Sequence, residues 1–292
     1  MKTRSEYQTE RESLTRQWQE ELARRVRGLQ NSLYLAILEA VLGFTTDKDD
    51  RIRFTTANVN RAARIGLTIQ TTNAENSRGL IGWLIERLLD VVDVNRKYFK
   101  SFVDYNTGAV DPQVRKLVLY RLGFDVDKDR LIPGGWLSEI SNATPIAQSV
   151  ARDVNAAIAA NMPLKQFQNQ FRAAFVDPGG LGYVEAHYNR FTFDLFQQVD
   201  RGVQKQYADE LELNHAVYSG TVKDNTRPFC KARVNHVYTR DEIESWEDLN
   251  FQGKILVGYN PFAHLGGYNC RHHLSWITEE LARRIGGINE YN

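Results

Sequence analysis

Two short segments near the C-terminus contain residues that could hold a metal ion. The first runs from Asp224 to Cys230, and the second contains His264, Cys270 and His272. The chain has only two cysteines, and each lies close to histidines in the sequence. Two thiolates and two imidazoles form a common ligand set for structural zinc. The sequence is therefore compatible with a zinc site made of Cys230, His264, Cys270 and His272. His236 and His273 are possible substitutes.

The same residues also allow a site without metal. No pair of cysteines is separated by two residues, so the pattern is not one of the usual zinc motifs. The cysteines can instead be buried apolar groups, with the histidines hydrogen-bonded in the core. A Cys230–Cys270 disulfide is a third alternative. Disulfides persist in oxidising compartments, which a protein reaches through an apolar signal segment, and residues 1–6 show no such segment. We therefore expect a reducing, cytosol-like compartment, which disfavours a disulfide.

Other candidate motifs are weaker. Residues 125–130 begin like a calcium loop, but Arg130 stands where glycine is needed. The glycines of 179–182 lack the Lys-Ser/Thr of a phosphate-binding loop, so we interpret this segment as a hinge. The basic run 24–27 lies beside acidic residues and is typical of a solvated helix face. The net charge of the chain is +1, whereas a protein that mainly binds nucleic acid usually has a large excess of basic residues.

The elements that position these residues fall into two parts. Up to about residue 180 the chain has apolar residues at helical spacing, as in 79–103. The pairs Asp111-Pro112, Thr144-Pro145 and Met162-Pro163 are typical of helix starts. The break at 177–182 separates this helical body, 1–180, from a C-terminal module, 181–292. No stretch reaches the roughly 20 apolar residues that a bilayer requires, so we expect no membrane contact.

The C-terminal module is predicted to mix helices and strands. An entry helix covers about 187–210, and the α+β part covers 213–292. Residues 215–222 are rich in β-branched and aromatic residues and predict a strand, and 254–259 could form a second. Thr239 is expected to cap a short helix, and 275–286 to be helical or extended. The predicted fold class is thus α+β, with a predominantly helical N-terminal body and a small α+β module.

The C-terminal pattern resembles a known family. Its specific parts are Thr226 to Cys230, Pro261 with His264, and 267–272, which reads Gly-Tyr-Asn-Cys-Arg-His. This resembles the tailed-phage minor head proteins, the head-morphogenesis family that includes the minor head protein of phage Mu. The family often has cysteine where His272 stands here.

The resemblance implies a structural constellation built from both segments: Asp224, Arg227, Cys230, His264, Asn269, Cys270, Arg271 and His272. It also implies a non-enzymatic virion protein inside the head, present in several copies and found in the host cytoplasm during assembly. The expected partners are the portal protein or inner capsid proteins, and the packaged DNA. The expected role is head assembly, or DNA packaging or ejection.

Two further functions remain open at this stage. Clustered histidines could serve a metal-dependent nuclease, with His264, His272 and His273 as base and ligands beside Asn269. Few carboxylates lie nearby to hold a hard catalytic metal. The chain could also be an internal virion protein that binds the genome, in which case its retention on DNA would fall steeply with salt.

Overall fold

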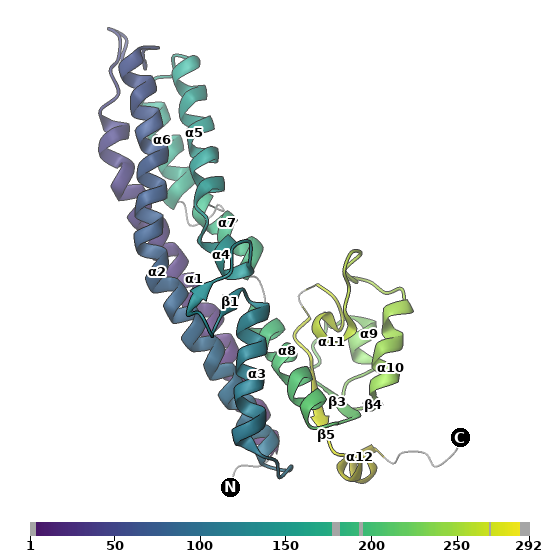
Figure 1. Ribbon diagram of the computed structural model, residues 1–292. Helices are drawn as coiled ribbons and strands as arrows, with labels where there is room; N and C mark the ends of the chain where they lie inside the picture. Colours follow the sequence, from purple (N-terminus) through teal and green to yellow (C-terminus); the bar gives the residue numbers. More distant parts are fainter. Residues whose placement is uncertain (1–3, 177–181, 193–194, 269, 287–292) are drawn as a thin grey trace. The chain divides into compact units, whose positions relative to one another are not determined.

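The computed structural model describes residues 4–176, 182–192, 195–268 and 270–286, and it is predominantly helical with two small antiparallel sheets (Figure 1). This confirms the predicted fold class of a helical body with a small α+β module. The helices are α1 Arg4–Leu42, α2 Thr56–Lys100, α3 Thr107–Arg121, α4 Trp136–Ser141, α5 Thr144–Ala159, α6 Leu164–Val176, α7 Tyr183–Thr192, α8 Leu195–Glu210, α9 Pro228–Lys231, α10 Arg240–Glu244, η1 Ser245–Asp248 (a 3-10 helix), α11 Pro261–His264 and α12 Glu279–Gly286. The strands are β1 Phe124–Asp125, β2 Arg130–Leu131, β3 His215–Ser219, β4 Val237–Thr239 and β5 His273–Ile277.

The chain forms two compact units, and both are discontinuous in the sequence. The first unit, which we call the tail unit, combines 1–18, 87–120 and 194–292. The second, the helical unit, combines 19–86 and 121–193. These units differ from the predicted segments 1–180 and 181–292. The reason is that the sheet of the tail unit needs helices to cover it, and the ends of α1 and α2 supply part of that cover.

Apolar periodicity explains the helical unit. Helix α5 begins at Thr144 with Pro145 in its first turn, as predicted, and buries apolar residues at steps of four. Helix α6 follows Pro163 and carries a row of aromatic rings, with Phe167–Phe171 and Phe171–Phe175 centroids 5.3 and 5.0 Å apart. The rings are tilted relative to each other, and aromatic pairs at these separations add to the stability gained from burial.

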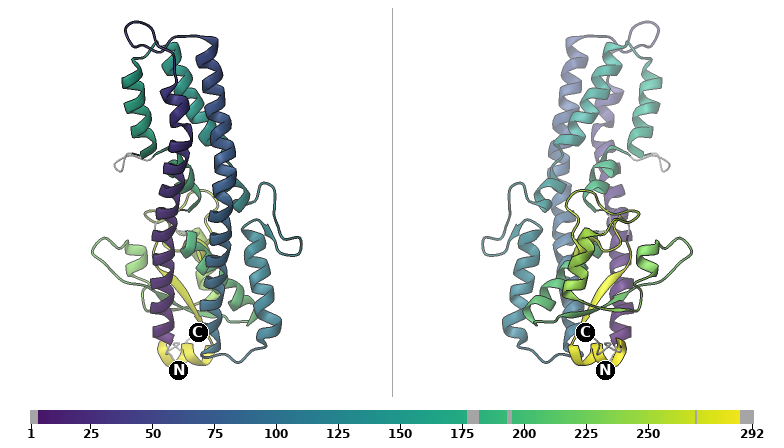
Figure 2. Two further views of the ribbon diagram at one scale, coloured as in Figure 1. Left: turned by 90° about the vertical axis from the view of Figure 1, so that its left-hand side faces the viewer. Right: turned by 90° about the vertical axis from the view of Figure 1, so that its right-hand side faces the viewer.

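A three-stranded antiparallel sheet in the order β4-β3-β5 forms the centre of the tail unit. The predicted strand at 215–222 is confirmed as the central strand β3, which pairs over its whole length with β5. Figure 2 shows β5 (yellow) alongside the first turns of α1, and the Tyr98 hydroxyl of α2 donates to the Trp276 carbonyl at 2.9 Å. On the other side of β3, Thr239 ends β4 and caps α10 through a capping box with Glu242, as predicted.

Three expectations about elements are wrong. Residues 254–259 form a loop with bends, because no neighbouring strand lies beside them within the described structure. Helix α3 begins at Thr107, so Pro112 lies inside it and not at its first position. The entry helix predicted for 187–210 is two helices, α7 and α8, that belong to different units. Part of the predicted hinge, 177–181, lies outside the described residues.

Candidate metal centre

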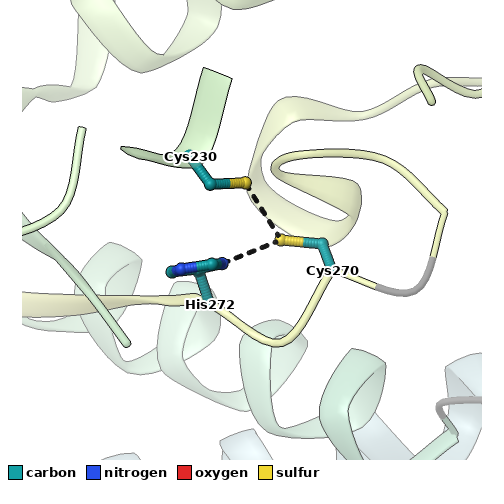
Figure 3. A group of neighbouring side chains, drawn as sticks. All are labelled: Cys230, Cys270 and His272. Atoms are coloured by element: carbon teal, nitrogen blue, oxygen red, sulfur yellow. Dashed lines mark hydrogen bonds between the residues drawn. The ribbon is translucent and has the colours of Figure 1, made fainter. Parts of the chain in front are cut away.

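The two cysteines meet in the buried interior of the tail unit, together with one histidine (Figure 3). The sulfurs of Cys230 and Cys270 lie 3.9 Å apart, and the Cys270 sulfur lies 3.6 Å from Nδ1 of His272. The potential ligand atoms of all three residues lie within 4.8 Å of one another. Both cysteines are free thiols. We call these three residues the Cys/His cluster; it could hold a metal ion.

Local structure fixes each member of the cluster. Cys230 lies on the single turn α9, which Pro228 starts. Cys270 and His272 lie in the segment that leads into β5, whose pairing with β3 anchors it. A Cβ on Gly266 would overlap the Cys230 sulfur and crowd the Cys270 sulfur, so only glycine lets the backbone pass so close to both thiols.

Tyr218 closes the cluster from the side of the sheet. Its hydroxyl donates to the Cys230 sulfur at 3.3 Å and lies 3.8 Å from the Cys270 sulfur. Its ring stacks on the His272 imidazole, with centroids 5.4 Å apart. Burial, together with the two neighbouring thiols, raises the pKa of Tyr218 far above its usual value, so the phenol stays a hydrogen-bond donor.

Arg201 of α8 is a member of this site that the sequence did not indicate. Its guanidinium is buried and donates to the carbonyls of Ala263 at 2.7 Å and His272 at 2.9 Å, and also to the Cys270 carbonyl. One side chain thus holds the backbone on both sides of the Cys/His cluster. An arginine on a predicted helix, more than sixty residues from the carbonyls that it contacts, gives no local signal of this role.

The pKa values of the two thiols shift in opposite directions. The hydrogen bond between them, together with burial, raises the pKa of Cys230. The same hydrogen bond lowers the pKa of Cys270 well below its usual value, assisted by His272 and by the charge of Arg201. Cys270 is therefore the first thiol to ionise, and the thiolate is the form of cysteine that binds metals.

The spacing of the cluster agrees with tetrahedral zinc for two of its three edges. Bonds of about 2.3 Å to sulfur and 2.05 Å to nitrogen place two sulfurs about 3.8 Å apart, and a sulfur and a nitrogen about 3.6 Å apart. The observed separations are 3.9 Å for the two sulfurs and 3.6 Å for the Cys270 sulfur and His272 Nδ1. The third edge, from Cys230 to His272, is no longer than 4.8 Å.

The predicted fourth ligand, His264, does not join the cluster. Its Nδ1 accepts a hydrogen bond from the Asn260 backbone at 2.8 Å, which ties the ring to the start of its own helix, α11. Burial lowers the pKa of His264, as expected for a ring that stays neutral. His273, named as a substitute, faces the other way along β5 and contacts Glu12 of α1 at 2.8 Å.

The other predicted members have separate positions. Arg227 donates to the Gly266 carbonyl at 3.1 Å, and so supports the turn that lies against the sulfurs. The side chains of Asp224 and Arg271 are exposed, so neither belongs to the buried Cys/His cluster. Asn269 lies outside the described residues. No helix in the described ranges is long and apolar enough to cross a membrane.

Comparison with known proteins gave no relatives. No family description, curated protein sequence or solved structure matches this chain.

Proposed function

We propose that the chain is a virion structural protein of the minor-head type, and that zinc bound by Cys230, Cys270 and His272 stabilises its tail unit. One observation supports both parts. The two segments that carry the family resemblance, forty residues apart at their cysteines, fold against each other and place the thiols in one buried cluster. The resemblance rests on those segments acting as one structural element.

The composition of the Cys/His cluster favours zinc over harder metals. Two sulfurs and an imidazole suit zinc, whereas magnesium and calcium prefer oxygen ligands. The Tyr218 hydroxyl lies within 3.8 Å of both sulfurs and, because it stays protonated, it would donate to a bound thiolate and not bind the metal. A buried water would supply the fourth position. Burial of all three ligands favours a structural role over a catalytic one, because a catalytic zinc keeps a position open to substrate. For this reason we do not propose the nuclease function.

The role in the virion follows the resemblance. The protein acts inside the head in several copies, bound to the portal or inner capsid proteins, and assists head assembly or DNA packaging and ejection. It is made in the host cytoplasm and performs no catalysis. Contact with the packaged DNA is part of this proposal, although the net charge of +1 limits it to local patches.

The metal part is tested by elemental analysis of the purified protein. We expect about one zinc per chain, since the three residues form a single group. Cys230→Ser, Cys270→Ser and His272→Ala should each lose it, whereas His264→Ala should retain it because that ring is used elsewhere. Zinc-free wild-type protein, or equal loss in the His264 variant, would contradict the proposed ligand set.

The virion part is tested by two measurements. The chain should appear in mass spectra of purified particles, and it should co-purify with the portal protein of the same virus. Absence from particles together with no portal binding would reject the virion role while leaving the zinc result unaffected.

A further inference from the structure

The two sulfurs of the Cys/His cluster are in direct contact (Figure 3). Sγ of Cys230 and Sγ of Cys270 lie 3.9 Å apart, and no other atom fits between two sulfurs at this separation. Both residues are free thiols, and neither lies in a strand of the sheet. A disulfide joins sulfurs about 2.05 Å apart, so its formation shortens the observed separation by about 1.9 Å. The pair is therefore placed for oxidation to a disulfide as well as for binding a metal.

The surroundings of the pair decide which oxidation product forms. A thiol that is oxidised alone becomes a sulfenic acid, which is oxidised further unless a second thiol captures it. Here the second thiol is in contact, and the Tyr218 hydroxyl lies within 3.8 Å of both sulfurs. The backbone of Gly266 also lies so close that a Cβ there would overlap the Cys230 sulfur. Because the cluster is packed on these sides, capture by the neighbouring thiol is favoured over attack by a second oxidant molecule.

A small oxidant can reach the pair through the segment that carries Cys270. Cys270 itself is only 4% exposed, but Tyr268 and Arg271, close to it in the sequence, are exposed to solvent. Strand β5 begins at His273, so this segment can open while β3 and β5 stay paired. Opening breaks the hydrogen bond from Arg201 to the Cys270 carbonyl, and oxidation should therefore be slower than that of a surface thiol.

We infer that Cys230 and Cys270 are a site of reversible disulfide formation by a peroxide, and that closing this bond releases the zinc. The release of zinc rests on the proposed function, whereas the disulfide rests on the geometry of the pair alone. Zinc binds the thiolate form of cysteine, and a disulfide has no thiolate, so the two states exclude each other. The tail unit thus has two alternative closures of the same two segments, a metal when reduced and a covalent bond when oxidised.

The chemistry balances with the peroxide as the only oxidant. One thiolate attacks a peroxide oxygen, so that an S–O bond forms, the O–O bond breaks and hydroxide leaves. The other thiolate attacks the resulting sulfenic sulfur, so that the S–S bond forms, the S–O bond breaks and a second hydroxide leaves. The two sulfurs lose two electrons in total, and the two peroxide oxygens gain them. Two protons convert the hydroxides to water; they come from solvent when zinc is bound and from the thiols when it is not.

The experiment treats the full chain with hydrogen peroxide, once with zinc bound and once after a chelator has removed the metal. Thiols are counted in denaturant, and released zinc is measured with a chromogenic chelator. Both arms should lose both thiols, and the zinc-loaded arm should release about one zinc for every two thiols lost. Dithiothreitol with added zinc should restore the thiols and the bound metal. Trypsin cuts after Lys231 and Arg271, so the peptides that end at these residues should appear joined in mass spectra.

Variants and a melting measurement provide the controls. Cys230→Ser and Cys270→Ser should form no bond within the chain, and their remaining thiol should gain oxygen or link two chains. His264→Ala is the matched control and should oxidise like wild type, because it leaves all three residues of the Cys/His cluster in place. Oxidised, metal-free wild type should melt at least about 4 °C above the reduced, metal-free form, because the bond constrains the unfolded chain. A lower melting temperature would overturn the role of the bond as an alternative closure.

The outcomes separate the inference from the proposed function. Thiols of metal-free wild type that stay reduced, only gain oxygen, or pair only between chains overturn the inference and leave zinc binding unaffected. A disulfide that forms while zinc stays bound overturns the exclusion of one state by the other. Purified protein that contains no zinc but forms the disulfide overturns the metal part of the proposed function, and with it the release of zinc, while it supports the disulfide site.

Discussion

Replacing Arg201 by methionine should strongly destabilise the tail unit. The guanidinium is buried and donates to three backbone carbonyls that belong to α11 and to the segment before β5. Arg201→Met keeps most of the side-chain volume and removes every donor. The three carbonyls then lose a charged partner at the point where the Cys/His cluster is assembled.

The expected magnitude follows from these three acceptors. A buried carbonyl left without its donor costs about 1–3 kcal/mol, so three set a lower bound of about 3 kcal/mol. Removing the buried charge also removes its desolvation cost, which offsets part of the loss. We therefore expect a destabilisation of about 3–5 kcal/mol. The stability of Arg201→Lys should lie between those of wild type and Arg201→Met, because one ammonium group cannot reach all three carbonyls.

Hydrogen exchange read by mass spectrometry is a suitable assay, because it reports the stability of β3 and β5 without requiring both units to unfold together. A loss of about 3–5 kcal/mol accelerates exchange there by about 100-fold or more. The matched control is Arg283→Met, since Arg283 is 67% exposed and its partner among the described residues is Glu279, one helical turn away. An exchange rate that changes less than about tenfold in Arg201→Met, or no more than in the control, would refute the stabilising role of the Arg201 hydrogen bonds.

Three smaller predictions concern other parts of the tail unit. Gly266→Ala should cost about 1–3 kcal/mol and reduce zinc content, because the added Cβ crowds both sulfurs; wild-type melting and zinc values would contradict the close approach. Thr239→Ala should cost about 1 kcal/mol in thermal unfolding, because it removes the capping box with Glu242, and an unchanged melting temperature would show that the cap is dispensable. Burial acts to raise the pKa of Asp209, but hydrogen bonds from a lysine and an arginine outweigh it and lower that pKa below its usual value. The contacts should therefore stabilise the fold above about pH 4 and lose this effect as the pH falls, and acid unfolding of Asp209→Asn should show a weaker pH dependence than wild type.

Local sequence signals predicted much of the fold. Proline positions and apolar spacing placed α5 and α6, and the threonine followed three residues later by glutamate placed the start of α10. These features depend on neighbours within a few residues. The strand at β3 was also recognisable, because residues 215–222 are rich in β-branched and aromatic residues. The structure buries all but the first residue of this strand.

Long-range pairing explains the errors. Residues 254–259 have strand composition but no partner, and composition alone cannot say whether a neighbour exists. Three of the four ligands predicted from cysteine and histidine spacing lie in the Cys/His cluster. The fourth, His264, instead accepts a hydrogen bond from the Asn260 backbone at the start of its own helix. Arg201 was missed because its contacts with carbonyls lie more than sixty residues away and leave no periodic pattern.

The discontinuous tail unit has a consequence for how the chain matures. Residues 4–18 leave the ribosome long before β5, yet β5 is among their packing partners. The helical unit can complete its own core once residue 193 has emerged, while the opening turns of α1 must wait for about eighty further residues before their binding surface exists. During that interval the face of those turns that carries Arg11, Thr15 and Trp18, buried in the folded protein, is open to chaperones or to early association with other subunits.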